Sequence, residues 1–156
     1  MGFANRGVYA EKKVKEYLDG WQGRSNYREF NRMTDSKAAG RIIKAAAADF
    51  DYYCVTKDMA RFHGLIEVKE TEHAYRLSRD KVTQLPRVRK RQKCGGKSYV
   101  VIYHSRTYQW RVATVPYLAE TGDKGSWNLT NMPSFTTCGL ALHYIDPAVF
   151  DSGMDL

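Results

Sequence analysis

Apolar residues recur in the first part of the chain with the spacing of one helix face. They stand at positions i, i+4, i+7 and i+8, and they are Ala10, Val14, Tyr17 and Leu18. A period of about 3.6 residues predicts an amphipathic α-helix. Asn5 can cap the start of this helix and Gly20 can end it.

Several shorter segments carry the aromatic and β-branched residues typical of strands: residues 27–31, 49–55, 64–70, 99–104 and 107–115. Residues 99–104 are apolar almost throughout, which predicts a central strand covered on both faces. Residues 107–115 alternate in character and follow closely, so we expect them to be its hairpin partner. A weaker signal predicts one more strand at 139–145. The polar residues 33–44 are expected to form a loop.

A basic helix is predicted between the strands at 64–70 and 99–104. Thr83 can cap it, Pro86 is tolerated in its first turn, and Gly95 and Gly96 can stop it. The order of elements is then helix, three strands, helix and two strands. This order predicts an α/β fold with a mixed central sheet flanked by helices.

The length of 156 residues allows one domain spanning 1–156. With 43% apolar residues there is material for one core, but no stretch approaches the ~18 apolar residues that span a bilayer. No secretory signal pattern is present at the N-terminus. Cys54, Cys94 and Cys138 are far apart, which argues against a disulfide framework or a structural zinc site. We therefore expect a cytoplasmic protein.

Positive charge is concentrated in one segment. Residues 76–97 hold nine cations against the single anion Asp80, a local net charge of +8 that equals the net charge of the whole chain. The cations are Arg76, Arg79, Lys81, Arg87, Arg89, Lys90, Arg91, Lys93 and Lys97. Such a patch attracts a polyanion through counterion release, so we expect these residues to bind nucleic acid. The alternative is a solvated helix face.

Charged residues interrupt the strand at 64–70. With a period of two, Glu67 and Lys69 share one strand face with Leu65. Taken alone, this pair would be a surface ion pair worth ~0–1 kcal/mol. Asp49 opens the preceding strand, however, and two adjacent strands can bring it beside Glu67. Two hard carboxylates side by side favour Mg²⁺, so the segment predicts a metal site next to Lys69. Asp51 shares the strand face of Asp49 and is the alternative ligand.

The pattern of Asp49 followed by Glu67, Val68 and Lys69 resembles the PD-(D/E)xK nuclease superfamily, with Ala48 before the first carboxylate in place of proline. The order of motifs around it is similar to the RecU-type Holliday-junction resolvases. That order comprises Asn5-Arg6-Gly7, Glu11, Asp49, Glu67 to Thr71, Gln84 before the basic helix, and the apolar strand 99–104. The resemblance covers about residues 5–115 and leaves 116–156 unassigned. Those proteins carry a longer stalk insertion where this chain has only the polar residues 31–45.

The resemblance implies a restriction-endonuclease-like fold and a role for each matching residue. Asp49, Glu67 and Glu11 would hold Mg²⁺, with Mn²⁺ as a substitute. Lys69 would orient or activate the attacking water, and Gln84 would lie near the same site. The implied activity is metal-dependent hydrolysis of phosphodiester bonds in Holliday junctions or other branched DNA. The small size and compact motif set suit a phage-encoded enzyme that acts in the cytoplasm of a bacterial cell.

Other chemistries lack their motifs. The sequence contains no nucleotide-binding P-loop, no G-x-S-x-G nucleophile motif and no metal-type histidine spacing, so no nucleotide cofactor is expected. The rivals are a repair or restriction-type nuclease of the same fold and a non-catalytic basic DNA-binding module. Tyrosines more often pack within a sheet, but four of them could instead stack on an unpaired base: Tyr52, Tyr53, Tyr75 and Tyr103.

A homodimer is expected because a symmetric junction presents two strands for incision. Trp110 and its neighbours in the strands at 99–104 and 107–115 supply aromatic residues of the kind enriched in interface cores.

Overall fold

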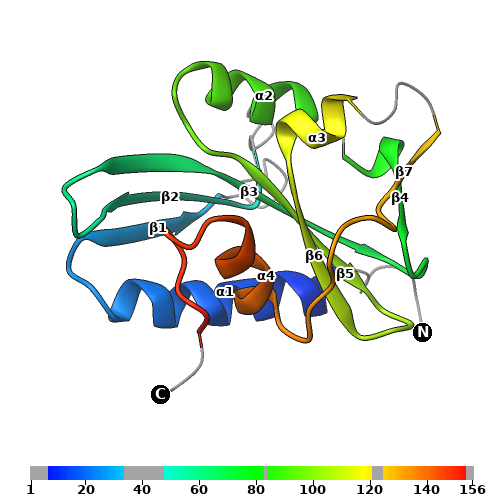
Figure 1. Cartoon of the computed structure of the whole chain (residues 1–156), viewed down its shortest axis with the longest axis horizontal. Coiled ribbons are helices and arrows are strands. Elements are labelled where there is room, and N and C mark those ends of the chain that lie inside the picture. Colours follow the sequence, from blue (N-terminus) through cyan, green and yellow to red (C-terminus); the bar gives the residue numbers. More distant parts are fainter. Residues whose placement is uncertain (1–6, 34–47, 83, 121–124, 154–156) are drawn as a thin grey trace, which may run out of the picture.

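A five-stranded mixed sheet forms the centre of the fold, in the order β1-β2-β3-β5-β6 (Figure 1). The computed structural model describes residues 7–33, 48–82, 84–120 and 125–153. β3 pairs in parallel with β5, and the other neighbours are antiparallel. The strands are β1 (Arg28–Arg32), β2 (Phe50–Val55), β3 (Arg61–Thr71), β5 (Tyr99–His104) and β6 (Gln109–Thr114). The predicted α/β class with a mixed central sheet is confirmed.

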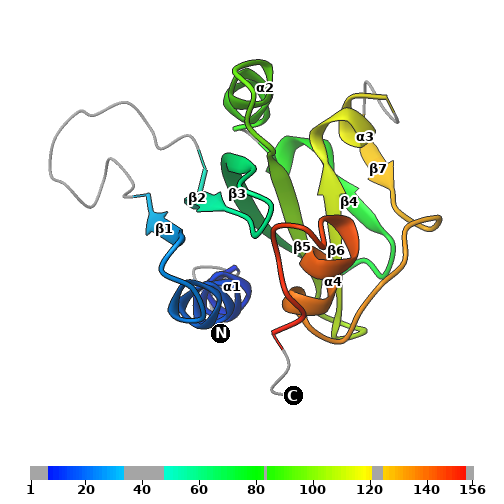
Figure 2. The ribbon, with the colours of Figure 1, turned by 60° about the vertical axis from the view of Figure 1, so that its left-hand side comes forward.

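Helices cover both faces of this sheet (Figure 2). α1 (Val8–Gly23) and α4 (Cys138–Ile145) pack on one face, and α2 (Leu85–Lys93) and α3 (Val115–Glu120) pack on the other. A small second sheet pairs β4 (Arg76–Ser78) with β7 (Ser126–Asn128), and a 3₁₀ turn, η2 (Arg79–Lys81), leads toward α2. The period-two strands therefore separate two apolar clusters, one beneath each pair of helices. In the described part of the chain, no helix is long and apolar enough to cross a membrane.

The predicted stripe of α1 is confirmed. Ala10, Val14 and Leu18 are fully buried. The helix continues past Gly20 to Gly23 because Trp21, three residues beyond Leu18, extends the same buried face. The proposed caps Asn5 and Thr83 lie outside the described residues, as does most of the predicted loop 33–44.

β5 is buried along its whole length, as predicted for a central strand, and β6 is its antiparallel hairpin partner. Trp110 on β6 is only 4% exposed and packs on Tyr103 with ring centroids 4.6 Å apart. The suggestion that Trp110 supplies an exposed dimer surface is therefore wrong. The alternation of β6 reflects two covered faces rather than one covered and one exposed face.

The strand predicted at 139–145 is wrong, because this segment is the helix α4. Thr137 caps the helix by accepting a hydrogen bond from the Leu140 N–H at 3.1 Å. Cys138, Ala141 and Leu142 form a buried i, i+3, i+4 set on its inner side. A short apolar run fits a strand and a buried helix equally well, so its period could not decide between them.

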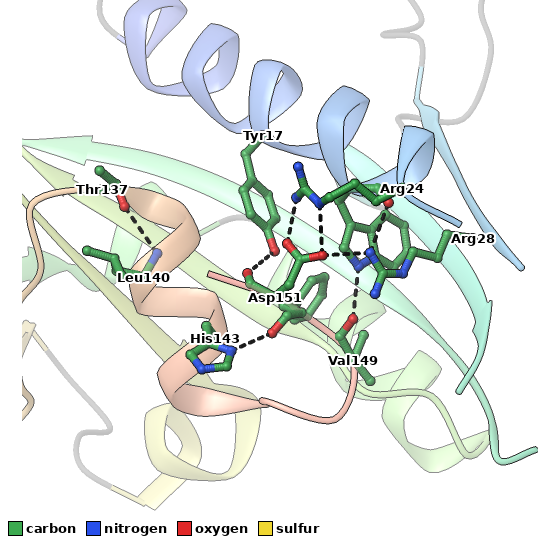
Figure 3. Close-up of polar contacts among 10 residues, drawn as sticks. Tyr17, Arg24, Arg28, Thr137, Leu140, His143, Val149 and Asp151 are labelled. Carbon is green, nitrogen blue, oxygen red and sulfur yellow. Dashed lines mark hydrogen bonds and ion pairs between the residues drawn. The ribbon is translucent and has the colours of Figure 1, made fainter. Parts of the chain in front are cut away.

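The C-terminal segment closes the core on the α1 side (Figure 3). Trp21 Nε1 donates to the Val149 carbonyl at 2.9 Å, and the Tyr17 hydroxyl donates to the Asp151 carbonyl at 2.7 Å. The Asp151 carboxylate accepts from Arg24 at 3.0 Å and from Arg28 at 2.7 Å. Residues 138–151, which the family resemblance did not cover, are thus an integral part of the fold.

Gly64 allows β3 to approach the segment that leads into β5. A Cβ placed on Gly64 would lie 1.6 Å from the Lys97 carbonyl oxygen and 2.8 Å from the Tyr52 ring. The same approach lets the Lys97 N–H donate to the His63 carbonyl at 2.7 Å. No side chain fits here without moving backbone.

We predict that Gly64→Ala lowers the free energy of unfolding by about 2 kcal/mol or more, because the clash is with backbone rather than with a flexible side chain. Gly23→Ala is the matched control: nothing lies within 4 Å of its Cβ, and alanine favours the helical conformation there. Urea denaturation of both variants measures the difference. Equal stability of the two variants would contradict this account of β3.

Candidate active site

Asp49 and Glu67 meet across the antiparallel ladder of β2 and β3. Phe50 pairs with Ile66, so the preceding residue, Asp49, lies opposite Glu67. The Asp49 carboxylate accepts a hydrogen bond from the Val68 N–H at 2.7 Å, which fixes it against β3. Glu67 is only 3% exposed. The juxtaposition predicted from the sequence is therefore present.

Lys69 lies on the same face of β3, two residues from Glu67. Its ammonium is 3.0 Å from Glu67 Oε1. The second oxygen, Glu67 Oε2, is buried and has no hydrogen-bond partner. Because a buried charged oxygen without a partner is costly, this atom marks a position where a ligand would be stabilised.

Burial and mutual repulsion disfavour the charged forms of both carboxylates. Burial, and next the nearby charge of Asp49, raises the pKa of Glu67 from 4.5 to about 7, although Lys69 opposes the shift. Burial also raises the pKa of Asp49, against the lowering effect of the Val68 N–H, and the charge of Glu11 adds to the rise. A cation placed between the carboxylates would reverse these effects.

Glu11 approaches the pair from α1, but its carboxylate is held by Arg32 at 2.8 Å. Arg32 is not among the residues predicted from the sequence. It ends β1 opposite Phe50, beside Asp49, and only the register of this edge strand reveals its position. Among the described residues, no group of three or more His, Cys, Asp or Glu side chains is arranged to hold a metal ion. The three-carboxylate ligand set thus stays a prediction.

The Asp49–Glu67 pair nevertheless fits a hard divalent cation. Both donors are carboxylates, and one oxygen of Glu67 is buried and unpartnered. Mg²⁺ commonly binds through one or two carboxylates and keeps several waters, so two protein ligands suffice. Asp51, the alternative ligand, lies opposite Leu65 and accepts a hydrogen bond from Asn31 at 3.1 Å. The unpartnered oxygen therefore favours Asp49 over Asp51.

Gln84 occupies the N-cap position of α2, where its carbonyl accepts from the Arg87 and Val88 N–H groups. No hydrogen bond joins its side chain to Asp49 or Glu67 in the described structure. Its role at the site remains a prediction from the resemblance.

The basic helix α2 lies on the sheet face that carries Glu67 and Lys69. Leu85 and Val88 anchor it to the cluster that contains Leu65, while Lys90 and Lys93 are exposed. At 3.6 residues per turn, the five cations of this helix are spread over more than one of its faces. Three arginines each keep a buried side-chain nitrogen without a hydrogen-bond partner: Arg79, Arg89 and Arg91.

Of the remaining cations of the patch, Arg87 is half-buried, and three others have neighbours within the chain. Lys97 forms an ion pair with Asp146 at 3.0 Å and lies over the Phe62 ring. Lys81 donates to the Glu70 carbonyl at 3.3 Å, and Arg76 lies over the Tyr75 ring. Lys90 and Lys93, which are exposed on α2, are therefore the cations of the patch that are best placed to contact a ligand.

Comparisons with known proteins find similarity among solved structures. No family model matches the chain, and no curated protein matches it. Among solved structures, the chain is similar to Hjc, a Holliday junction resolvase from the archaeal hyperthermophile Archaeoglobus fulgidus, at 19% identity with a TM-score of 0.48. The alignment covers 78% of this chain and 88% of that chain. At this level of similarity, functional inference has to rest on the chain's own side chains.

We predict that Glu67→Gln is more stable than the parent protein at pH 8 in EDTA and that the difference shrinks toward pH 5. The folded-state pKa of about 7 lies above the ordinary value, so the folded state binds more protons and stability falls as pH rises through 7. At ~1.36 kcal/mol per pKa unit, the gain is on the order of 2 kcal/mol. Thermal denaturation across this pH range measures it.

Glu29→Gln, on the exposed side of β1, is the control and should show no such pH-dependent difference. If the stability of Glu67→Gln equals that of the parent protein at every pH, burial of the charged Glu67 carboxylate does not destabilise the fold.

Proposed function

We propose that this protein is a divalent-cation-dependent endodeoxyribonuclease that acts on branched DNA. The observation that carries the proposal is the Asp49–Glu67 pair, with Lys69 3.0 Å from one Glu67 oxygen and the other oxygen buried and unpartnered. The same combination of two carboxylates and one ammonium is the pattern through which the sequence resembles the PD-(D/E)xK nucleases.

The charge of each site residue determines its proposed role. Asp49 and Glu67 would hold Mg²⁺ or Mn²⁺, with Glu11 acting on the surrounding water from α1. The cation, when bound, would lower the pKa of a water molecule and polarise the scissile phosphate. Lys69 would then orient the attacking water and offset the negative charge that develops on the phosphate. The Val68 N–H keeps Asp49 aimed at this position.

Substrate DNA would reach the site along the face that carries α2. The exposed Lys90 and Lys93 lie on the same side of the sheet as Glu67, so one DNA backbone could contact both regions. Cations that neutralise phosphates supply affinity but carry no base sequence information. This arrangement suits recognition of DNA shape rather than of sequence.

The preference for four-way junctions rests on the motif order shared with the RecU-type resolvases, and so does the expected homodimer. A repair or restriction-type nuclease on other DNA is the alternative with the same site. The deciding experiment incubates purified protein with a labelled four-way junction and with matching linear duplex, in Mg²⁺ or in EDTA. We expect paired symmetric cuts in the junction only with Mg²⁺. Equal cutting of linear duplex would favour the alternative.

We predict that Asp49→Asn and Glu67→Gln each abolish cleavage while DNA binding is retained or tightened. Removing a carboxylate next to phosphates removes both the cation ligand and a repulsive charge. Asp51→Asn is the matched control, since Asp51 lies on the same strand face but its carboxylate accepts a hydrogen bond from Asn31. It should cut at the parental rate.

Gel-based cleavage and fluorescence anisotropy separate the two effects. A Glu67→Gln protein that cuts normally would remove this site from the mechanism, and a parent protein that binds DNA without ever cutting it would support the non-catalytic binding module.

We predict that Lys90→Gln with Lys93→Gln weakens binding to all DNA shapes alike. The slope of log K against log salt should flatten by roughly one unit for each lost phosphate contact. The control is Lys12→Gln with Lys15→Gln, two exposed lysines on α1, which packs on the opposite sheet face. An unchanged slope in the α2 variant, or an equal change in the control, would show that DNA does not lie along α2.

A further inference from the structure

Exposed aromatic side chains gather at the end of β2 and β3 away from the carboxylates. Tyr53 is 45% exposed, and its ring stacks on His63 with centroids 6.2 Å apart and an interplanar angle of 21°. Tyr53 and His63 line a surface hollow of about 320 Å³, and Tyr27, which is 67% exposed, lines it as well. Of the other tyrosines singled out from the sequence, Tyr52 and Tyr103 are buried in the core, whereas Tyr75 is also 45% exposed and has Arg76 over its ring.

This aromatic pair shares its sheet face with the candidate active site. Asp49 immediately precedes β2 and lies four residues from Tyr53, and by strand periodicity both lie on the same side, as Glu67 and His63 do on β3. At ~3.3 Å per residue the two positions are about 13 Å apart, a distance that a DNA strand covers in a few nucleotides. α2 lies over the middle of the sheet, and none of the described helices lies over the β2–β3 turn (Figure 1).

The chemistry of the hollow favours a base over a phosphate. Its lining includes Arg28 and Arg61 but also Glu29, and Arg28 is paired with Asp151 at 2.7 Å. The charge left to Arg61 is opposed by Glu29, so charge attraction cannot dominate. What it offers is the flat surface of Tyr53, backed by His63 and bordered by Tyr27. Aromatic faces of this kind stack on any nucleobase, provided that the base is unpaired or flipped out of its helix.

We propose that Tyr53, supported by His63, is a stacking platform for an unpaired base of the DNA strand that occupies the active site. The proposal rests on the proposed function, because the DNA at the carboxylates determines which strand passes over Tyr53. Such a platform favours binding of DNA in which branching has left a base unstacked. A continuous duplex presents no such base.

The test uses DNA in which 2-aminopurine replaces one base at successive positions near the cut, bound in EDTA so that no cleavage occurs. We expect quenching of its fluorescence at one position by the parent protein and by Tyr53→Phe. Tyr53→Leu should lose the quenching and bind the same DNA roughly tenfold more weakly. His63→Leu should reduce both effects, and circular dichroism verifies that each variant is folded.

Tyr144→Leu is the matched control, because Tyr144 is 59% exposed but lies on α4, on the opposite face of the sheet. It should bind and quench like the parent protein. Quenching that persists in Tyr53→Leu, or that occurs at no position, overturns the platform. A change of oligomeric state in Tyr53→Leu without loss of quenching also overturns it, because the face is then a protein interface.

The two proposals fail separately. If the parent protein cuts the DNA in Mg²⁺ but Tyr53→Leu binds and quenches like it, only the platform is wrong. If the parent protein quenches 2-aminopurine through Tyr53 but never cuts DNA, the platform stands and the nuclease proposal is wrong.

Discussion

The carboxylates of Asp49 and Glu67 face each other across two antiparallel strands, and burial disfavours the negative charge on both. Lys69 neutralises one oxygen of Glu67 and the Val68 N–H satisfies one oxygen of Asp49, but Glu67 Oε2 is left buried without a partner. The rest of the fold has to hold these groups together against their repulsion. A divalent cation would relieve the same repulsion. The arrangement that is unfavourable in the free protein is therefore the one that the proposed activity requires.

The strand register is what holds the pair. A slip of one residue in β3 would turn Glu67 toward the apolar face beneath α1 and would separate it from Asp49. The close approach of Gly64 to the Lys97 backbone fixes β3 at one position relative to its neighbours. Packing on both faces of the sheet, completed by the C-terminal contacts of Val149 and Asp151 with α1, supplies the stability that the site itself does not.

The sequence predicted the centre of this protein better than its edges. The face shared by Glu67 and Lys69 follows from strand periodicity alone, and the uninterrupted apolar run of β5 marked it as central. Arg32 was missed because its place beside Asp49 depends on how an edge strand pairs, which no local pattern encodes. The ion pair of Lys97 could not be predicted because its partner Asp146 is 49 positions away in the chain. α4 was misassigned because a short apolar run carries too little periodicity.

The central claim is that Asp49 and Glu67 together bind a divalent cation. Its most direct test is anomalous X-ray scattering from crystals of the protein soaked in Mn²⁺. The account predicts a single strong peak within about 2–2.5 Å of a carboxylate oxygen of Asp49 and of Glu67 Oε2. Mn²⁺ bound elsewhere, in crystals of a protein that cuts DNA with Mn²⁺ in solution, would contradict it.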